Sequence, residues 1–282
     1  MSFIQKLIKE IKHLKPIPAV ANQLLSVVDH PDSSMEDIAN VIQYDPVITA
    51  GVLKTCNSAF FGLKHPAESI KDAVNILGID QVVELVLLKS GAENLSGSQE
   101  GYGLESGEIW RYSVSSAVIA KQVAIKLSLK NKNTIFTSAL VKDIGKILLE
   151  KYVSRFSKKI EALVQSGKFS FSEAEKKVLG IDHAELGAMI AKIWKFSPKM
   201  VNIIRHHHLP DETMIKNKEI AAVYLADCIC MMTGTGVGLD GLSYRFKDRI
   251  MAELNFSADD ISLMIADFGI NIQEVEKLLQ IV

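Results

Sequence analysis

Apolar residues recur at intervals of three and four along nearly the whole chain, which is the spacing of amphipathic helices. Near the start, Phe3, Leu7 and Ile11 share one face, while lysines lie off it. Similar stripes run through residues 20–28, 38–42 and 47–53. More helices are predicted at about residues 69–77, 79–91, 108–128, 134–152, 155–166, 171–179, 182–195, 198–208 and 218–232, and about three follow residue 241. No stretch alternates as a half-buried strand would, so we predict an all-α fold.

Local signals mark where several of these helices begin. Ser33 with Glu36 three residues later has the spacing of a capping box. Asp45 followed by Pro46 predicts an N-cap and a first-turn proline. Farther along, Asp182 is expected to cap a helix, with Glu185 completing a box. These positions set the register of the apolar stripes.

Two segments rich in small polar residues interrupt the helical pattern. Residues 91–107 are expected to form a surface loop and the main internal boundary, and residues 233–241 a second, flexible loop. The second segment formally matches a G-x-G-x-x-G, but a helix precedes it, whereas a dinucleotide site needs a strand. We therefore divide the chain into an N-terminal helical lobe (1–92), a second helical lobe (108–232) and a C-terminal extension (233–282) packed on the second lobe.

Composition narrows the classes of function. The chain has 282 residues, with 32 basic and 33 acidic side chains and a net charge of −1, which gives no electrostatic footprint for nucleic acid. No window approaches the roughly 20 apolar residues that span a bilayer, and no signal peptide is evident. Three cysteines form no disulfide framework. We expect a cytoplasmic protein that binds neither nucleic acid nor membrane.

Four ionisable residues lie on stripes that should be buried. Asp143 continues the stripe of Phe136 and Leu140, and the other three, each on a separate predicted helix, are His183, His207 and Asp227. A buried charge without a partner or metal costs several kcal/mol. We therefore expect these side chains to meet in one polar site.

Simpler interpretations of these residues remain open. Asp143 could pair with Lys146 one turn on, and each histidine could be an ordinary structural one. The run His206–His208 could be an exposed helix end that interacts with the helix dipole. Lys142, directly before Asp143, is the most informative neighbour, because a protonated lysine repels a divalent cation and offers it no lone pair.

Several motifs resemble one protein family. Val141-Lys-Asp-Ile-Gly-Lys146, Asp182-His-Ala-Glu-Leu-Gly187 and Ile204-Arg-His-His-His208 resemble the HD superfamily of metal-dependent phosphohydrolases. The N-terminal part has four further motifs: Leu14-Lys-Pro-Ile-Pro18, Asp45-Pro46, Leu53-Lys-Thr-Cys-Asn-Ser-Ala-Phe-Phe-Gly62 and Ser69-Ile-Lys-Asp-Ala-Val-Asn-Ile-Leu-Gly78. These motifs are similar to the HDOD domain, the HD-related output domain of bacterial signalling proteins. The resemblance runs from about residue 11 to 210.

The resemblance implies a degenerate HD site in the second lobe. Active HD enzymes use an early histidine, a His-Asp pair and a later aspartate, and these positions correspond here to Tyr112, Lys142 with Asp143, and Asp227. The additional histidines of binuclear relatives correspond to His183 and to either His206 or His207. Two of the four principal ligands are therefore replaced, and the Gly-Tyr-Pro signature of the cyclic-di-nucleotide phosphodiesterase branch is absent.

Two arrangements of this vestigial site remain open. Asp143, His183, His207 and Asp227 could still hold one divalent cation such as Mn, Fe, Ni or Mg, although no cofactor is expected. Alternatively, the ammonium group of Lys142 could lie between the carboxylates, so that a salt bridge replaces the metal.

The resemblance implies a non-catalytic regulatory module of bacterial signal transduction. Such a module would bind signalling partner proteins and could bind a small effector or a nucleotide second messenger. The two glycine-rich segments and the stretch around Phe60 and Phe61 are candidate contact surfaces. The alternative is a phosphohydrolase with an atypical metal site, in which Asp143 and Asp227 would hold a metal-bound water.

Overall fold

The structure is a computed structural model that describes residues 3–281 except 13, 15–18, 29, 31, 59–60, 96, 210–211, 240 and 242–248. The motif at residues 14–18 and Phe60 therefore fall largely outside the described residues. Every regular element of the described part is a helix, and the predicted all-α fold is confirmed. In chain order the helices are α1 (Phe3–Ile11), α2 (Ala19–Val28), α3 (Met35–Ile42), α4 (Pro46–Cys56), α5 (Ile70–Leu77), α6 (Ile79–Leu95), the 3₁₀ turn η1 (Glu100–Tyr102), α7 (Glu108–Lys126), α8 (Lys132–Val141), α9 (Ile144–Gln165), α10 (Phe171–Leu179), α11 (His183–Ile193), α12 (Pro198–His206), η2 (Glu212–Lys216), α13 (Lys218–Met232), α14 (Arg249–Leu254) and α15 (Ala258–Ile281).

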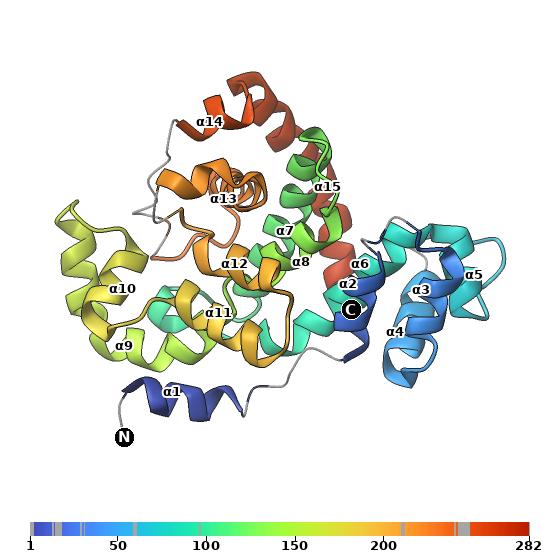
Figure 1. Ribbon diagram of the computed structural model, residues 1–282, viewed down its shortest axis with the longest axis horizontal. Coiled ribbons are helices and arrows are strands. Elements are labelled where there is room, and N and C mark those ends of the chain that lie inside the picture. The colour runs from blue at the N-terminus through green and yellow to red at the C-terminus, as the bar shows by residue number, and fades with distance from the viewer. Residues whose placement is uncertain are drawn as a thin grey trace.

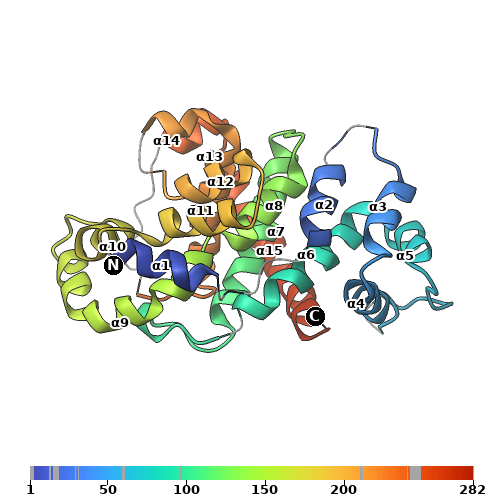
Figure 2. The same cartoon turned by 60° about the horizontal axis from the view of Figure 1, so that its bottom comes forward.

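The helices form two groups joined by α6. Helices α2–α5 gather at one end of the molecule and α9–α10 at the other, as two views show (Figures 1 and 2). Helix α6 contacts α2, α4 and α5 on one side and α7, α8 and α9 on the other. Helix α1 lies against α9, where the rings of Phe3 and Tyr152 meet edge to face at 4.8 Å and Lys151 pairs with Glu10 at 2.6 Å. Within the described residues, none of the helices combines the length and the apolar character that crossing a bilayer requires.

Close packing between α9 and α11 positions the polar site. A Cβ atom at Gly145 would collide with the carbonyl oxygen of His183, and one at Gly187 would lie 3.2 Å from the carbonyl oxygen of Lys142. Glycine at both positions therefore lets the two backbones approach within van der Waals contact. This approach places the first turn of α11 beside the Lys142–Asp143 pair.

Several predicted boundaries are confirmed and others are wrong. Asp45 caps α4 and is followed by a first-turn proline, as predicted. Ser197 caps α12 in the same way. The capping box of α3 uses Ser34 and Asp37 instead of Ser33 and Glu36. Asp182 caps α11, but no reciprocal bond from Glu185 completes a box, since that carboxylate faces Lys176 and Arg205.

The largest error concerns the predicted helices at 134–152 and 155–166. Helix α9 runs unbroken from Ile144 to Gln165, and the break falls earlier, at Lys142 and Asp143. The apolar stripe continues across this bend and the local sequence has no proline at it, so periodicity could not locate it. The bend directs both side chains into the protein, where each is 1% exposed.

The two glycine-rich segments pack against each other. Residues 91–95 belong to α6, and beyond them Gly101 lies so close to α9 that a Cβ atom would be 2.6 Å from the backbone nitrogen of Ser154. Leu239 N donates a 2.8 Å hydrogen bond to the carbonyl oxygen of Tyr102, which is fully buried. The expected loop at 91–107 therefore begins later than predicted, and both segments include glycines that serve close backbone approach.

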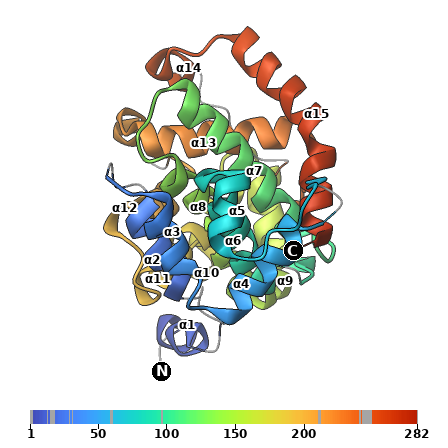
Figure 3. The same ribbon diagram turned by 90° about the vertical axis from the view of Figure 1, so that its right-hand side faces the viewer.

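The C-terminal region contains two described helices after residue 241, where about three were expected. Helix α14 contacts α13 and lies at the end of the molecule opposite α1 (Figure 3). Helix α15 contacts α7, and Lys126 of α7 pairs with Asp260 of α15 at 2.6 Å.

Candidate functional site

A buried lysine lies at the centre of the polar site. The ammonium group of Lys142 forms an ion pair with Asp143 Oδ2 and a second, at 2.7 Å, with Asp227 Oδ1. All three side chains are at most 2% exposed. The bend between α8 and α9 supplies the first two residues and α13 supplies Asp227, so one cation joins two carboxylates from separate helices.

Tyr112 of α7 completes this ion-pair network. Its hydroxyl donates a 2.5 Å hydrogen bond to Asp227 Oδ1, and its ring lies 4.5 Å from the ammonium nitrogen of Lys142. An aromatic face attracts a desolvated cation, and a hydroxyl stabilises an ionised carboxylate. Both contacts favour the charged state of the network.

The second oxygen of Asp143 faces a different set of groups. Asp143 Oδ1 lies 3.0 Å from the ammonium nitrogen of Lys146, 3.6 Å from His183 Nε2 and 4.0 Å from His207 Nε2. The two oxygens of this carboxylate therefore point to two neighbouring polar regions, one filled by Lys142 and one lined by histidines.

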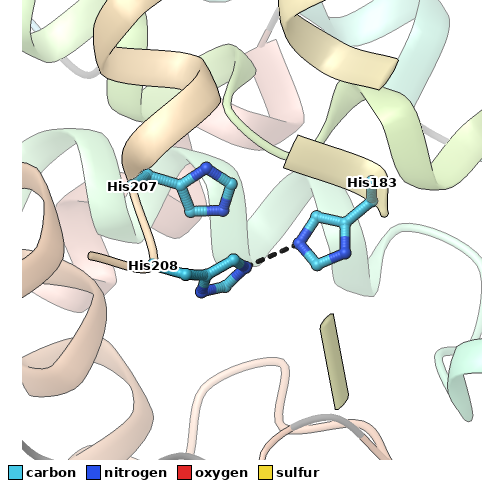
Figure 4. Close-up of side chains that lie close together, drawn as sticks. All are labelled: His183, His207 and His208. Atoms are coloured by element: carbon cyan, nitrogen blue, oxygen red, sulfur yellow. Dashed lines mark hydrogen bonds between the residues drawn. The ribbon is translucent and has the colours of Figure 1, made fainter. Parts of the chain in front are cut away.

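Three histidine rings converge beside Asp143. His183 begins α11, while His207 and His208 follow the last residue of α12, and Figure 4 shows the three rings turned toward one another. His183 Nε2 and His208 Nε2 are 2.7 Å apart and share a hydrogen bond. The ring centroids of His183 and His207 are 5.6 Å apart.

A buried glutamate orients His183. Glu175 of α10, which is 0% exposed, accepts hydrogen bonds from His183 Nδ1 at 2.6 Å and from the His183 backbone nitrogen at 3.1 Å. Its other oxygen accepts a 2.5 Å bond from the hydroxyl of Tyr102. These bonds fix the ring so that Nε2 faces His208 and Asp143.

Charges in the network shift the pKa values of its members. Burial alone would lower the pKa of Lys142, but the carboxylates of Asp143 and Asp227 outweigh it and raise that pKa above its ordinary value. Burial opposes ionisation of Asp143 as well, yet Lys142 and Lys146 hold its pKa well below the usual range. Burial also opposes ionisation of Asp227, but the ammonium group of Lys142 outweighs it and lowers the pKa of Asp227.

The pKa values of the three histidines are shifted in different directions. Burial lowers the pKa of His207 and of His208 well below the ordinary value, which keeps both imidazoles neutral. Burial also acts on His183, but its contacts with Glu175 more than compensate and raise its pKa.

Comparison with known proteins places the chain in a family. A model of the HDOD domain matches residues 14–210, which is most of the chain. The chain belongs to the HDOD domain family. A crystal structure of an HDOD domain protein of unknown function from Geobacter sulfurreducens superposes with a TM-score of 0.72 at 23% identity, covering 98% of this chain and 96% of that one.

Other relatives share the fold at similar distance. A protein of Shewanella amazonensis SB2B, provisionally assigned as a phosphohydrolase, superposes with a TM-score of 0.68 at 23% identity and covers 98% of this chain and 97% of its own. A curated relative, an uncharacterized protein of Treponema pallidum (strain Nichols), is 22% identical over 201 residues. The match takes in 69% of this chain, which spans only 38% of the length of that relative.

The HDOD chain does not fit a metal at the principal HD position. The ammonium group of Lys142 lies between Asp143 and Asp227, the two carboxylates that the resemblance assigns to a metal. Tyr112, which the resemblance assigns to the early histidine position, has a hydroxyl that already donates to Asp227. A protonated amine supplies no lone pair for a metal, and a neutral phenol that donates its proton to Asp227 is a much weaker ligand than an imidazole.

The structure distributes the residues singled out from sequence over the two regions. Tyr112, Lys142 and Asp227 lie on one side of Asp143, and His183 and His207 lie on the other. His206 is half-buried and is not among the three histidines whose ring nitrogens converge, whereas His208 is.

Sequence reasoning missed three contributors. His208 follows the end of α12, where helical spacing no longer gives the direction of a side chain. Glu175 lies in the charged helix α10, and Tyr102 lies in a glycine-rich segment. Glu175 lies eight residues before His183 and belongs to no motif, so only the fold brings its carboxylate to that ring.

Proposed function

We propose that this HDOD protein is a non-catalytic regulatory module that acts by binding signalling partner proteins or an effector. The observation that carries the proposal is the ammonium group of Lys142, which contacts both Asp143 and Asp227 where a bridging metal would bind. Family membership supports a regulatory role at the coarse level, and the fold is shared with a protein provisionally assigned to signal transduction from Marinobacter aquaeolei VT8. That structure superposes with a TM-score of 0.74 at 18% identity, covering 95% of this chain and 60% of its own.

The chemistry of phosphoester hydrolysis explains why the lysine matters. A metal ion lowers the pKa of its bound water to about 7 and polarises the phosphoryl oxygen. An ammonium group can donate hydrogen bonds to a phosphate, but it cannot hold a hydroxide as a metal does. The ion pairs therefore retain the architecture of the site while removing its nucleophile.

The proposal predicts no phosphohydrolase turnover. Purified full chain would be assayed on bis-p-nitrophenyl phosphate, nucleoside triphosphates and cyclic di-nucleotides with Mn²⁺, Fe²⁺, Ni²⁺ or Mg²⁺ in turn. We expect rates equal to those of the buffer with metal. Turnover by the wild type that disappears in Asp143→Asn would refute the non-catalytic proposal.

Partner binding needs a separate experiment. The full chain would be immobilised, retained proteins identified by mass spectrometry, and each candidate purified and tested by reciprocal capture and titration. We expect a partner or a small effector that binds saturably. An absence of saturable binding together with metal-dependent turnover would favour the phosphohydrolase alternative, for which the three converging histidines are the specific supporting observation.

A further inference from the structure

The three converging histidines form a site distinct from the position of Lys142. The nearest ring nitrogens of His183, His207 and His208 all lie within 4.8 Å of one another. His183 and His207 are at most 1% exposed, and His208 is half-buried. We propose that these three side chains bind a single first-row transition metal ion, and that this ion ties the start of α11 to the end of α12.

Two of the histidines are held in the orientation that ligands require. His183 Nδ1 is bonded to Glu175, and His207 Nδ1 donates to the carbonyl oxygen of Ile204 at 2.7 Å, so in each ring Nε2 faces the site. Metal-binding histidines typically donate their other ring N–H to a carboxylate or a backbone carbonyl, which fixes the tautomer. Tyr102 in turn anchors Glu175.

An unsatisfied nitrogen points into the same space. His207 Nε2 is buried and has no hydrogen-bond partner among the described residues. A buried polar atom without a partner is destabilising, so native proteins rarely retain one without a reason. A metal ion that accepts the lone pair of His207 Nε2 would satisfy this nitrogen.

The site needs side-chain movement to take an ion, because its ring nitrogens now lie up to 4.8 Å apart. With metal–nitrogen distances of about 2.0–2.1 Å, two nitrogens of a tetrahedral site lie about 3.3 Å apart. His183 Nε2 and His208 Nε2, now 2.7 Å apart, would have to separate by a few tenths of an ångström as the proton between them leaves. Side-chain rotation of the half-buried His208 provides that movement and the entry route.

Ligand chemistry selects the kind of ion. Three imidazole nitrogens favour zinc, cobalt, nickel or copper over magnesium or calcium, which prefer oxygen ligands. Asp143 Oδ1, at 3.6 and 4.0 Å from two of the nitrogens, supplies a nearby negative charge while it remains paired with Lys146. Lys142 bonds to the opposite oxygen, so its ammonium group and the ion occupy different sides of one carboxylate.

Equilibrium binding to tag-free full chain tests the proposal. Protein stripped with chelator would be dialysed against Zn²⁺, and bound metal measured by elemental analysis. We expect one zinc ion per chain, with at least about 100-fold weaker binding in His207→Gln and in His208→Gln. The matched control is His206→Gln, the adjacent histidine that lies outside the cluster, and it should bind zinc as the wild type does.

Spectroscopy of the wild type keeps the test independent of variant folding. X-ray absorption of the zinc-loaded chain should show three imidazole ligands, and cobalt substitution should give the intense visible bands of a four-coordinate ion. Failure to retain zinc, equal weakening in His206→Gln, or a spectrum with one imidazole or none would overturn the proposal. The outcome is separable from the proposed regulatory function, which needs no metal and is tested by turnover and partner binding.

Discussion

Replacing Lys142 by methionine removes the ammonium group from the ion-pair network while keeping a chain of similar length. The substitution leaves Asp143 and Asp227 buried, each at 1% exposure, without the cation that joins them. Tyr112 still donates to Asp227 and Lys146 still faces Asp143 Oδ1, so neither carboxylate loses every partner. The variant therefore tests how much the central cation contributes.

The expected loss of stability is large. Breaking a buried ion pair by removing one partner costs about 3–5 kcal/mol, because a desolvated charge remains. Since the remaining contacts compensate in part, we expect the free energy of unfolding to fall by about 3 kcal/mol at pH 7.5. Lys126→Met is the matched control, since it breaks a Lys–Asp pair at the surface, where the loss should stay below about 1 kcal/mol.

The loss should depend on pH with a defined sign. In the wild type the pKa values of Asp143 and Asp227 are lowered, so their stabilising contribution is present above the unfolded value of about 3.9 and disappears as pH falls. The pKa of Lys142 is raised, so its contribution is present below about 10.4 and is lost as pH rises through the folded value. The difference between wild type and variant should therefore be greatest near neutral pH and shrink as pH falls toward about 4, because the unpaired buried carboxylates of the variant take up protons over this range.

Urea unfolding followed by circular dichroism measures both quantities by linear extrapolation. A second substitution, Asp227→Asn, should restore part of the stability lost in the methionine variant, because it removes the stranded charge. A loss below about 1 kcal/mol at pH 7.5, or one that does not change between pH 7.5 and pH 4, would show that the ion pairs are not the stabilising element described here.

Three further predictions concern the surroundings of the site. Gly145→Ala forces α9 away from α11 and should lower stability by at least about 1–3 kcal/mol, whereas Gly97→Ala, with open space around its Cβ, should leave the melting temperature nearly unchanged. Tyr112→Phe deletes one hydrogen bond to an ionised carboxylate and should cost about 1.5–3 kcal/mol in urea unfolding; a smaller loss would mean that Asp227 is satisfied by Lys142 alone. Burial raises the pKa of all three thiols, so native protein should resist iodoacetamide while urea-unfolded protein is alkylated at Cys56, Cys228 and Cys230, as mass spectrometry would record.

Periodicity identified most helices because each buries one face, and a stripe of apolar residues is visible without knowledge of its partner. The method failed where the backbone bends without changing that stripe, as at Lys142 and Asp143 between α8 and α9. It also gave no sign that Gly101, in the segment expected to be a surface loop, lies against the backbone of α9. Tight approach between backbones depends on both partners, and one sequence segment shows only one of them.

Only part of the site could be predicted from the sequence, because its arrangement also depends on contacts between distant segments. Asp143, His183, His207 and Asp227 could be singled out because each breaks an apolar stripe. The division of the site into a region around Lys142 and a region of histidines depends on which oxygen of Asp143 faces which neighbour. That information is in the bend before α9 and in the packing of Gly145 on α11, neither of which has a linear signature.

The lysine between the two carboxylates has a consequence for how the protein responds to its environment. The occupancy of a coordinated metal ion depends on the free concentration of that metal, and a chelator can remove the ion. The cation at this position is encoded in the chain, arrives when the protein is synthesised and is present in every copy at full occupancy. Helices α9 and α13 are therefore linked through Asp143 and Asp227 at any concentration of free metal, because the cation that links them is part of the same chain.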